Sequence, residues 1–248
     1  MTDSKNAEAQ KHIRCVPGDV ARSVLLPGDP ARARRIAEQL EDARLIADNR
    51  EYVVFTGKTS GVAVSVCSTG IGGSSAAIAL EELRNVGAEV FIRVGSAGGR
   101  RKDIPIGSLV VVTAAYRGDG VSDEYLPLGF PAVADLDVNN ALIQAAKELG
   151  YKAFTGIGTT RSAFYARHPE LNEQLRRAGV VAAEMEASTL FIVGTLRGAK
   201  VGCVVATDSN IYLEEQPALA EKEALYMQGE LLSIRTALRA VQLLEGQF

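Results

Sequence analysis

Residues 75–99 read SAAIALEELRNVGAEVFIRVGSAGG, in which a helical pattern leads into a strand pattern with a glycine-rich end. Apolar residues recur at helical spacing over Ser75–Val86, which predicts a helix. Val90–Val94 is a short apolar run with β-branched residues, which predicts a buried strand. A helix that leads directly into a buried strand is typical of α/β proteins.

The same alternation continues along the chain in both directions. The remaining strand patterns are Ser23–Leu26, Tyr52–Thr56, Ala63–Cys67, Ser108–Ala115, Ala153–Thr159 and Val201–Ala206. The remaining helix patterns are Ala31–Leu40, Asn139–Leu149, Ala187–Leu196 and Glu221–Leu244. Residues 1–12 are polar and are expected to form a loose N-terminal arm. With no linker or repeat, residues 1–248 are predicted to form one α/β domain, whose central mixed, largely parallel sheet is flanked by helices.

Composition excludes several classes of protein. The 248 residues carry a net charge of −3, so the basic surface of a nucleic-acid-binding protein is absent. No apolar run reaches the roughly 18 residues that span a bilayer, and the polar N-terminus lacks a signal-peptide core. Cys15, Cys67 and Cys203 are widely spaced and odd in number, which suits the reducing cytoplasm and forms no metal-ligand pattern. His12 and His168 are the only histidines, so a multi-histidine metal site is excluded.

Two predicted strands are followed by glycine-containing loops and helices. Ser23–Leu26 leads into Pro27-Gly28-Asp29-Pro30 and Arg32. Gly28 allows close approach to a ligand, and the arginine one turn later could clamp phosphate; solvated arginines on an ordinary strand-turn-helix are the alternative. Ala63–Cys67 leads into STGIGGSS, which half matches the dinucleotide fingerprint, but Ser75 holds its third glycine position. A dinucleotide oxidoreductase is therefore disfavoured, and a glycine-lined pocket for a small ligand is favoured.

Charged residues at two further strand ends and in one apolar segment complete the candidate site. Arg93 lies inside an apolar strand and precedes Ser96, which suggests a second oxyanion-binding element or a salt bridge to a helix. Asp208 ends the strand Val201–Ala206, where it could act as a general acid or simply cap a turn. Glu184 and Glu186 lie in the apolar segment VVAAEMEASTLFIVG. A buried carboxylate there needs a partner such as a sugar hydroxyl, unless both only begin a helix.

These elements suggest one reaction when they are combined. Arginines and glycine loops suit phosphate, a buried glutamate suits ribose, and an aspartate at a strand end suits protonation of a departing base. We therefore infer the phosphorolysis of a nucleoside.

The motifs PGDPARARRIAE, NREYVVFTG, STGIGGSSAAIALEEL, FIRVGSAGG, FPAVADLD, SAFY and VVAAEMEASTLFIVGTLRGAK occur in the order found in one family. The chain resembles the nucleoside phosphorylases of the hexameric purine nucleoside and uridine phosphorylase type. The resemblance implies a pentosyltransferase that acts in the cytoplasm with phosphate as co-substrate and no cofactor or metal. It also implies a homo-hexamer, a trimer of dimers with active sites shared between subunits.

The resemblance also assigns roles to individual residues. Asp208, Arg93 and Glu186 would be catalytic. Phosphate would bind Gly28, Arg32, Arg50, Arg93 and Ser96, with Arg50 supplied by a neighbouring subunit. Ribose would bind Met185, Glu186 and a neighbour's His12, and the base would lie against Phe164, Gly98, Glu184, Asp208 and His168.

The base preference rests on few residues. Uridine phosphorylases have a glutamine and an arginine shortly after the Phe-Tyr pair, and His168 and Glu170 occupy those positions here. Asp208 matches the acid that contacts purine N7, so a purine ribonucleoside is favoured, with uridine as the alternative. Methylthioadenosine phosphorolysis, hydrolysis by a nucleosidase and non-catalytic nucleoside binding are further alternatives.

Overall fold

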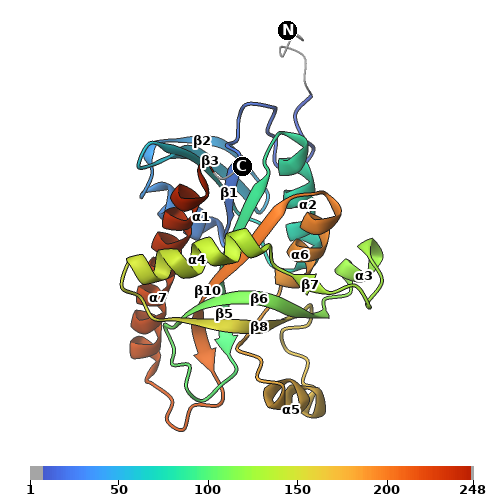
Figure 1. Cartoon of the computed structure of the whole chain (residues 1–248), viewed down its shortest axis with the longest axis vertical. Coiled ribbons are helices and arrows are strands. Elements are labelled where there is room, and N and C mark those ends of the chain that lie inside the picture. Colours follow the sequence, from blue (N-terminus) through green and yellow to red (C-terminus); the bar gives the residue numbers. More distant parts are fainter. Residues whose placement is uncertain (1–7, 247–248) are drawn as a thin grey trace.

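The computed structural model describes residues 8–246, which fold around one ten-stranded sheet with helices on both sides (Figure 1). The strands are β1 (Ser23–Leu26), β2 (Glu41–Asn49), β3 (Tyr52–Thr59), β4 (Val62–Cys67), β5 (Val90–Gly99), β6 (Leu109–Gly118), β7 (Ala132–Val133), β8 (Ala153–Arg161), β9 (Ala182–Glu184) and β10 (Lys200–Asn210). The helices are α1 (Pro30–Ala37), α2 (Gly73–Asn85), α3 (Val121–Tyr125), α4 (Leu136–Glu148), α5 (Pro169–Arg177), α6 (Ala187–Leu196) and α7 (Leu219–Leu244).

The strand order brings the carboxyl ends of β1, β5 and β10 to one edge of the sheet. β5 lies parallel to β1 and to β10, with Arg93 paired to Leu26 on one side and to Cys203 on the other. The order β10-β6-β8-β9-β5 and the additional β10–β5 pairing close five strands into a ring. The predicted α/β class and mixed sheet are confirmed. The sheet is less parallel than expected, because five of the ten pairings among the described strands are antiparallel.

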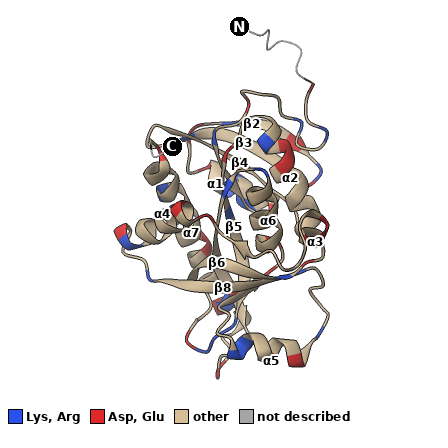
Figure 2. Cartoon of the chain, turned by 45° about the vertical axis from the view of Figure 1, so that its right-hand side comes forward, with Lys and Arg blue, Asp and Glu red and all other residues tan. Residues whose placement is uncertain are grey.

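Two apolar clusters pack against the sheet. The first includes Leu80 of α2 and Phe191 of α6. The second includes Leu142 of α4 and Ala237 of α7, and Figure 1 shows these two helices on the opposite side from α2 and α6. Figure 2 shows acidic and basic residues interspersed over the helices and loops, as expected for a small net charge.

The bounds of several elements differ from the predicted ones. The strands predicted at Val90–Val94 and Val201–Ala206 are the first halves of β5 and β10, which stay paired through their glycine-rich and polar ends. The helix predicted at Ala31–Leu40 is shorter, beginning at Pro30 and ending at Ala37. Its start is fixed by Asp29, whose side chain accepts hydrogen bonds from the second and third residues that follow it.

The N-terminal arm is docked where the described residues begin. Residues 1–7 of the predicted arm lie outside the described residues. The main-chain N–H groups of His12 and Ile13 donate to Glu82 Oε2 at 2.8 and 2.9 Å, and His12 Nδ1 lies 2.6 Å from Glu82 Oε1. Ile13 is fully buried. The chain is therefore anchored on α2 at His12, where the predicted arm ends, and the loose arm before it stays a prediction.

The cysteines are buried and unpaired. Burial is the main reason that the pKa of Cys15 rises to about 12, so this thiol stays protonated at neutral pH. Within residues 8–246, no helix is long and apolar enough to cross a membrane. The same residues contain no group of three or more His, Cys, Asp or Glu that could hold a metal ion.

Asp119, directly after β6, is a buried carboxylate with four hydrogen-bond donors. Its oxygens accept from the N–H and hydroxyl of Ser122 at 2.6 and 2.9 Å, and from the hydroxyls of Ser188 and Thr189 at 2.5 and 2.8 Å. Burial opposes ionisation, but the donors lower the pKa of Asp119 below its ordinary value. Asp119 therefore ties α3 to the first turn of α6.

We expect Asp119→Asn to lower the free energy of unfolding at pH 7 by about 2–4 kcal/mol, because an amide nitrogen cannot accept these hydrogen bonds. The carboxylate contributes stability above its unfolded-state pKa and loses it as pH falls through the lowered native pKa, so the difference should shrink in acid. Urea unfolding measures it, with Ser122→Ala as a control that removes one side-chain donor and costs about 1 kcal/mol. Equal stability of Asp119→Asn and the parent at pH 7 would contradict this role.

Candidate functional site

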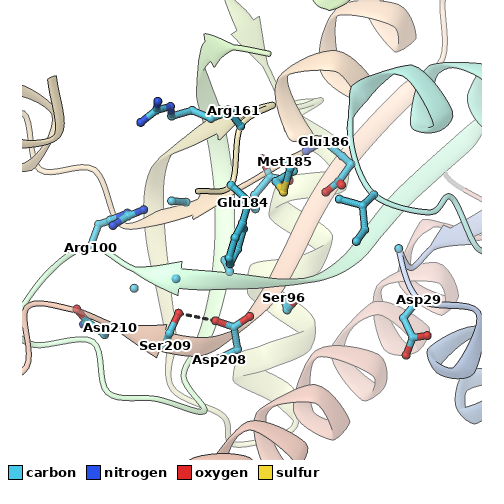
Figure 3. A pocket seen from close by; sticks show the side chains of 18 of the residues that line it. Asp29, Ser96, Arg100, Arg161, Glu184, Met185, Glu186, Asp208, Ser209 and Asn210 are labelled. Atoms are coloured by element: carbon cyan, nitrogen blue, oxygen red, sulfur yellow. Dashed lines mark hydrogen bonds between the residues drawn. The ribbon is translucent and has the colours of Figure 1, made fainter. Parts of the chain in front are cut away.

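A cavity of about 750 Å³ lies at the carboxyl ends of β1, β5 and β10. This volume is within the range that holds small organic ligands. Its walls come from the loops after β1 and β4, the ends of β5 and β10, the segment after β8 and the junction of β9 with α6 (Figure 3). The lining residues are Gly28, Asp29, Pro30, Arg32, Gly70, Ile71, Arg93, Ser96, Ala97, Gly98, Gly99, Arg100, Arg161, Ala163, Phe164, Ala166, Arg167, Asn172, Ala183, Glu184, Met185, Glu186, Asp208, Ser209, Asn210 and Ile211.

Glycines bring the loops after β1 and β4 together at this cavity. A Cβ atom on Gly28 would lie 3.0 Å from the carbonyl oxygen of Gly70, so a side chain would force the loops apart. Gly72 precedes α2 with φ +99°, a backbone conformation that favours glycine. Its N–H donates to Glu186 Oε1 at 2.5 Å, so the start of α2 holds the carboxylate predicted to bind ribose.

Arg32 lines the cavity, but much of its hydrogen-bonding capacity is already used. Its Nε donates to Glu230 Oε2 at 2.7 Å, its Nη1 to the carbonyl oxygen of Val94 at 3.0 Å, and its Nη2 to the hydroxyl of Tyr226. Three of the five N–H groups of a guanidinium are therefore engaged within the protein. Ser96 lines the same wall. The structure thus brings Arg32 and Ser96 together as predicted and adds a support from α7 that the sequence did not indicate.

Arg93 and two glutamates form the buried centre of the site. Arg93 is 4% exposed; its Nε donates to Glu184 Oε2 at 2.8 Å, and its Nη2 pairs with Glu186 Oε2. Its Nη1 is buried and has no hydrogen-bond partner among the described residues. A buried guanidinium nitrogen is rarely unsatisfied, so this nitrogen, in a residue that lines the cavity, is a candidate donor to a ligand.

The three charges of this centre shift one another's protonation. Burial opposes the charged form of Arg93, but the carboxylates of Glu186 and Glu184 raise its pKa above the ordinary value, so it stays charged. Burial is the main reason that the pKa of Glu186 is raised; the negative charge of Glu184 raises it further, and the positive charge of Arg93 opposes this shift. Glu186 is therefore the member of the centre that protonates more readily than an ordinary glutamate.

Glu184 organises the turn from β9 to α6. Its oxygens accept hydrogen bonds from the N–H groups of Glu186 and Ala187 at about 2.9 Å and from the Thr160 hydroxyl at 2.6 Å. The sequence predicted Glu184 as a base contact. The side chain reaches the cavity wall, but its geometry is that of an anchor for Arg93 and for the main chain of Glu186. Met185 lines the cavity between the two glutamates, where a ribose contact was predicted.

Three of the predicted base contacts line another part of the cavity, which we call its base end; Figure 3 shows one of them, Asp208, beside Ser209. Gly98 and Phe164 line it, and the Phe164 side chain is 69% exposed. Asp208 is half-buried, and its Oδ1 accepts a hydrogen bond from the Ser209 hydroxyl at 2.6 Å. His168 instead lies exposed immediately before α5, outside the cavity lining, whereas its neighbour Arg167 lines the cavity.

His12 and Arg50 also lie outside the lining of this cavity. Arg50 is exposed in the turn between β2 and β3, with φ +55°. Both residues were predicted to act in the site of a neighbouring subunit, and that remains a prediction.

Sequence reasoning missed four residues of the site. Tyr226 and Glu230 lie one turn apart on α7 and support Arg32; a glutamate among the apolar residues of a helix was the available signal. Arg100 and Arg161 line the cavity beside the predicted base contacts. Arg100 begins the polar stretch RRKD, which reads as a solvated loop, and Arg161 directly precedes the SAFY motif, in which only Phe164 was assigned a contact.

Comparison with known proteins gives consistent matches over nearly the whole chain. The family model described as the phosphorylase superfamily matches residues 22–242. The uridine phosphorylase of Thermococcus kodakarensis is 46% identical over 238 residues, covering 91% of this chain and 86% of the relative. The guanosine phosphorylase of Halorubrum lacusprofundi is 37% identical over 207 residues, covering 84% of this chain and 86% of the relative.

Solved structures give the same result. A uridine phosphorylase from Vibrio fischeri has a TM-score of 0.90 and 34% identity, covering 96% of this chain and 99% of that protein. A purine nucleoside phosphorylase from Toxoplasma gondii in complex with immucillin-H has a TM-score of 0.89 and 33% identity, covering 98% and 99%. Relatives named for pyrimidine and for purine nucleosides therefore share this fold almost equally well.

Proposed function

The chain belongs to the phosphorylase superfamily and is a nucleoside phosphorylase, and on this basis we propose that it cleaves uridine with phosphate to uracil and ribose 1-phosphate. The observation that carries the proposal is the Arg93 centre. One buried guanidinium with an unpartnered nitrogen adjoins both the glycine loops suited to phosphate and the Glu186 carboxylate suited to ribose hydroxyls.

In the proposed reaction an oxygen of phosphate forms a bond to ribose C1′ as the bond from C1′ to the base breaks. Arg93, Arg32, Gly28 and Ser96 hold the phosphate, and Glu186 holds the ribose, so the reacting atoms are aligned beforehand. Stabilisation of the transition state by charged groups already in place around the breaking bond is usually the largest contribution to catalysis. The arginines also argue against a nucleosidase, in which water replaces phosphate.

The choice of base differs from the one the sequence favoured. The residues alone favoured a purine because of Asp208, with uridine as the alternative. The comparisons support that alternative better, since relatives named uridine phosphorylase match at 46% and 37% identity over most of the chain. A 6-oxopurine nucleoside is the second candidate, supported by the guanosine phosphorylase relative and by Asp208 at the base end.

A phosphorolysis panel tests this proposal. Uridine, inosine, guanosine, adenosine and methylthioadenosine are incubated with and without phosphate, and free base and ribose 1-phosphate are measured. We expect turnover only with phosphate and the highest kcat/KM with uridine. Asp208→Asn should lower inosine turnover by about 10²-fold if the aspartate donates to a purine. Phosphate-independent cleavage would indicate a nucleosidase, and binding without turnover a nucleoside-binding protein.

We also propose the remaining properties that the family resemblance implies: a cytoplasmic hexamer, built as three dimers, in which Arg50 and His12 complete a neighbour's site and no metal or organic cofactor takes part. Docking of His12 on Glu82 supports this assembly, because it fixes one ring nitrogen and leaves the other for a partner.

A further inference from the structure

Three arginines converge on the base end of the cavity. Arg100 follows β5, Arg161 ends β8, and Arg167 lies in the segment before α5. Figure 3 shows Arg100 and Arg161 on the side of the cavity away from Asp29. We call Arg100, Arg161 and Arg167 the arginine cluster. The sequence motif that reads uracil in uridine phosphorylases assigns neither Arg100 nor Arg161.

The arginine cluster has no acidic partner within residues 8–246. No hydrogen bond or ion pair joins the side chains of Arg100 and Arg161 to any residue of that range, and Arg167 donates only to the carbonyl oxygen of Phe164 at 3.3 Å. By contrast, Arg32 and Arg93, in the same cavity, are each paired with a buried glutamate. The cluster therefore keeps its donors free for a ligand.

The charges of the cluster also oppose one another. Burial lowers the pKa of Arg100, and the positive charges of Arg161 and Arg167 lower it further, although Tyr212 acts in the opposite sense. A ligand with carbonyl oxygens or negative charge would relieve this repulsion. A guanidinium offers donors and no acceptor, so an amino group on the ligand would instead leave donors facing donors.

We propose that the arginine cluster restricts the enzyme to nucleobases with an imide edge, in which a ring N–H lies between two carbonyl groups, as in uracil and xanthine. Cytosine and adenine each present an amino group on the corresponding edge and are rejected. This inference rests on the proposed function and adds the substrate class. The rule concerns the edge of the base and not the number of its rings, so it groups the pyrimidine uracil with the purine xanthine.

The same groups assist the chemistry. When the bond from C1′ to the base breaks, its electron pair leaves with the base, whose negative charge spreads onto the ring carbonyl oxygens. Guanidinium groups at those oxygens stabilise this charge, and the released base anion takes a proton from water. Bases that lack the two carbonyl groups gain less from the cluster, so selectivity should appear in kcat as well as in KM.

The test compares kcat/KM for uridine with cytidine, and for xanthosine with adenosine, in the parent enzyme, Arg100→Met and Arg161→Met. A hydrogen bond to a charged group accounts for roughly a 10- to 100-fold change. We expect kcat/KM for uridine and for xanthosine to fall by about that factor in each variant. Any kcat/KM for cytidine or adenosine should fall less than threefold. Arg100→Lys should recover part of the loss by restoring charge. Arg235→Met, exposed on α7 and outside the cavity, is the matched control and should change neither ratio.

Equilibrium binding separates this proposal from the proposed function. Calorimetry with free uracil, xanthine, cytosine and adenine needs no turnover. If the parent phosphorolyses no nucleoside but binds uracil and xanthine, and Arg100→Met weakens both at least tenfold, the assigned reaction fails and the base selectivity stands. If cytosine and adenine bind as tightly as uracil, or if both methionine variants keep the parent's ratios within threefold, the proposal is overturned. Thermal unfolding shows whether each variant is folded. If Arg100→Met or Arg161→Met does not fold, Arg167→Met, at an exposed position, is tested in its place.

Discussion

Arg93→Met is expected to lower kcat/KM for the preferred nucleoside by roughly 10³-fold, because it removes the buried cation at which phosphate is proposed to bind. The same change should lower the free energy of unfolding by about 3–5 kcal/mol, since Glu184 and Glu186 would remain buried without their counter-ion. Steady-state kinetics at varied phosphate and urea unfolding measure the two effects.

A second substitution separates catalysis from stability. Glu184→Gln in the Arg93→Met background removes one of the two unpaired carboxylates, and the glutamine oxygen can still accept from the N–H groups of Glu186 and Ala187. We expect Arg93→Met/Glu184→Gln to regain much of the lost stability and none of the lost activity. Recovery of phosphorolysis in this double variant would show that Arg93 acts only through folding.

Arg197 provides the matched control on the surface. Its guanidinium pairs with Glu81 at 2.8 Å, but both side chains are partly exposed. A surface ion pair contributes up to about 1 kcal/mol, so Arg197→Met should change stability little and leave kcat/KM intact. The contrast between two arginine–glutamate pairs in one chain isolates the effect of burial.

Strands that are buried on both faces could be predicted from sequence, because they form continuous apolar runs. β5, β6 and β10 were found for this reason. β2 was missed because it lies at the end of the strand order with most of its residues exposed, so its residues carry no apolar alternation. β9 has three residues and was hidden in an apolar segment that continues into α6. Pairing across the sheet, and not local pattern, makes both of these segments strands.

The candidate site was predictable where strand ends carry unusual residues. Gly28, Arg93, Ser96 and Asp208 follow or end parallel neighbouring strands, and their convergence follows from the α/β topology. Arg161 could not be found in this way, since it reaches the cavity only because five strands close into a ring through β8 and β9. The local sequence says nothing about such a closure.

Glu186→Gln is expected to lower kcat/KM for the ribonucleoside by about 10²-fold while leaving the fold intact. The glutamine oxygen can still accept from the N–H of Gly72, but the amide nitrogen faces Arg93 and cannot accept from ribose hydroxyls. Because a site built to bind hydroxyls discriminates against a substrate that lacks one, the variant should also lose preference for uridine over 2′-deoxyuridine. Glu148→Gln, on the exposed end of α4, is the control and should retain both rate and preference.

The pH dependence of Glu186 gives this prediction a second readout with a definite sign. Burial raises the pKa of Glu186, so its ionisation costs stability as pH rises through that raised value, and Glu186→Gln should unfold at the same temperature as the parent or higher at pH 7. Activity has the opposite requirement, since only the carboxylate accepts from both ribose hydroxyls. The parent's kcat/KM should therefore fall in acid with a midpoint above the roughly 4.3 of a free glutamate, and this limb should be absent in Glu186→Gln. A variant that keeps the acid limb would place the titrating group elsewhere in the cavity and remove Glu186 from the ribose contacts.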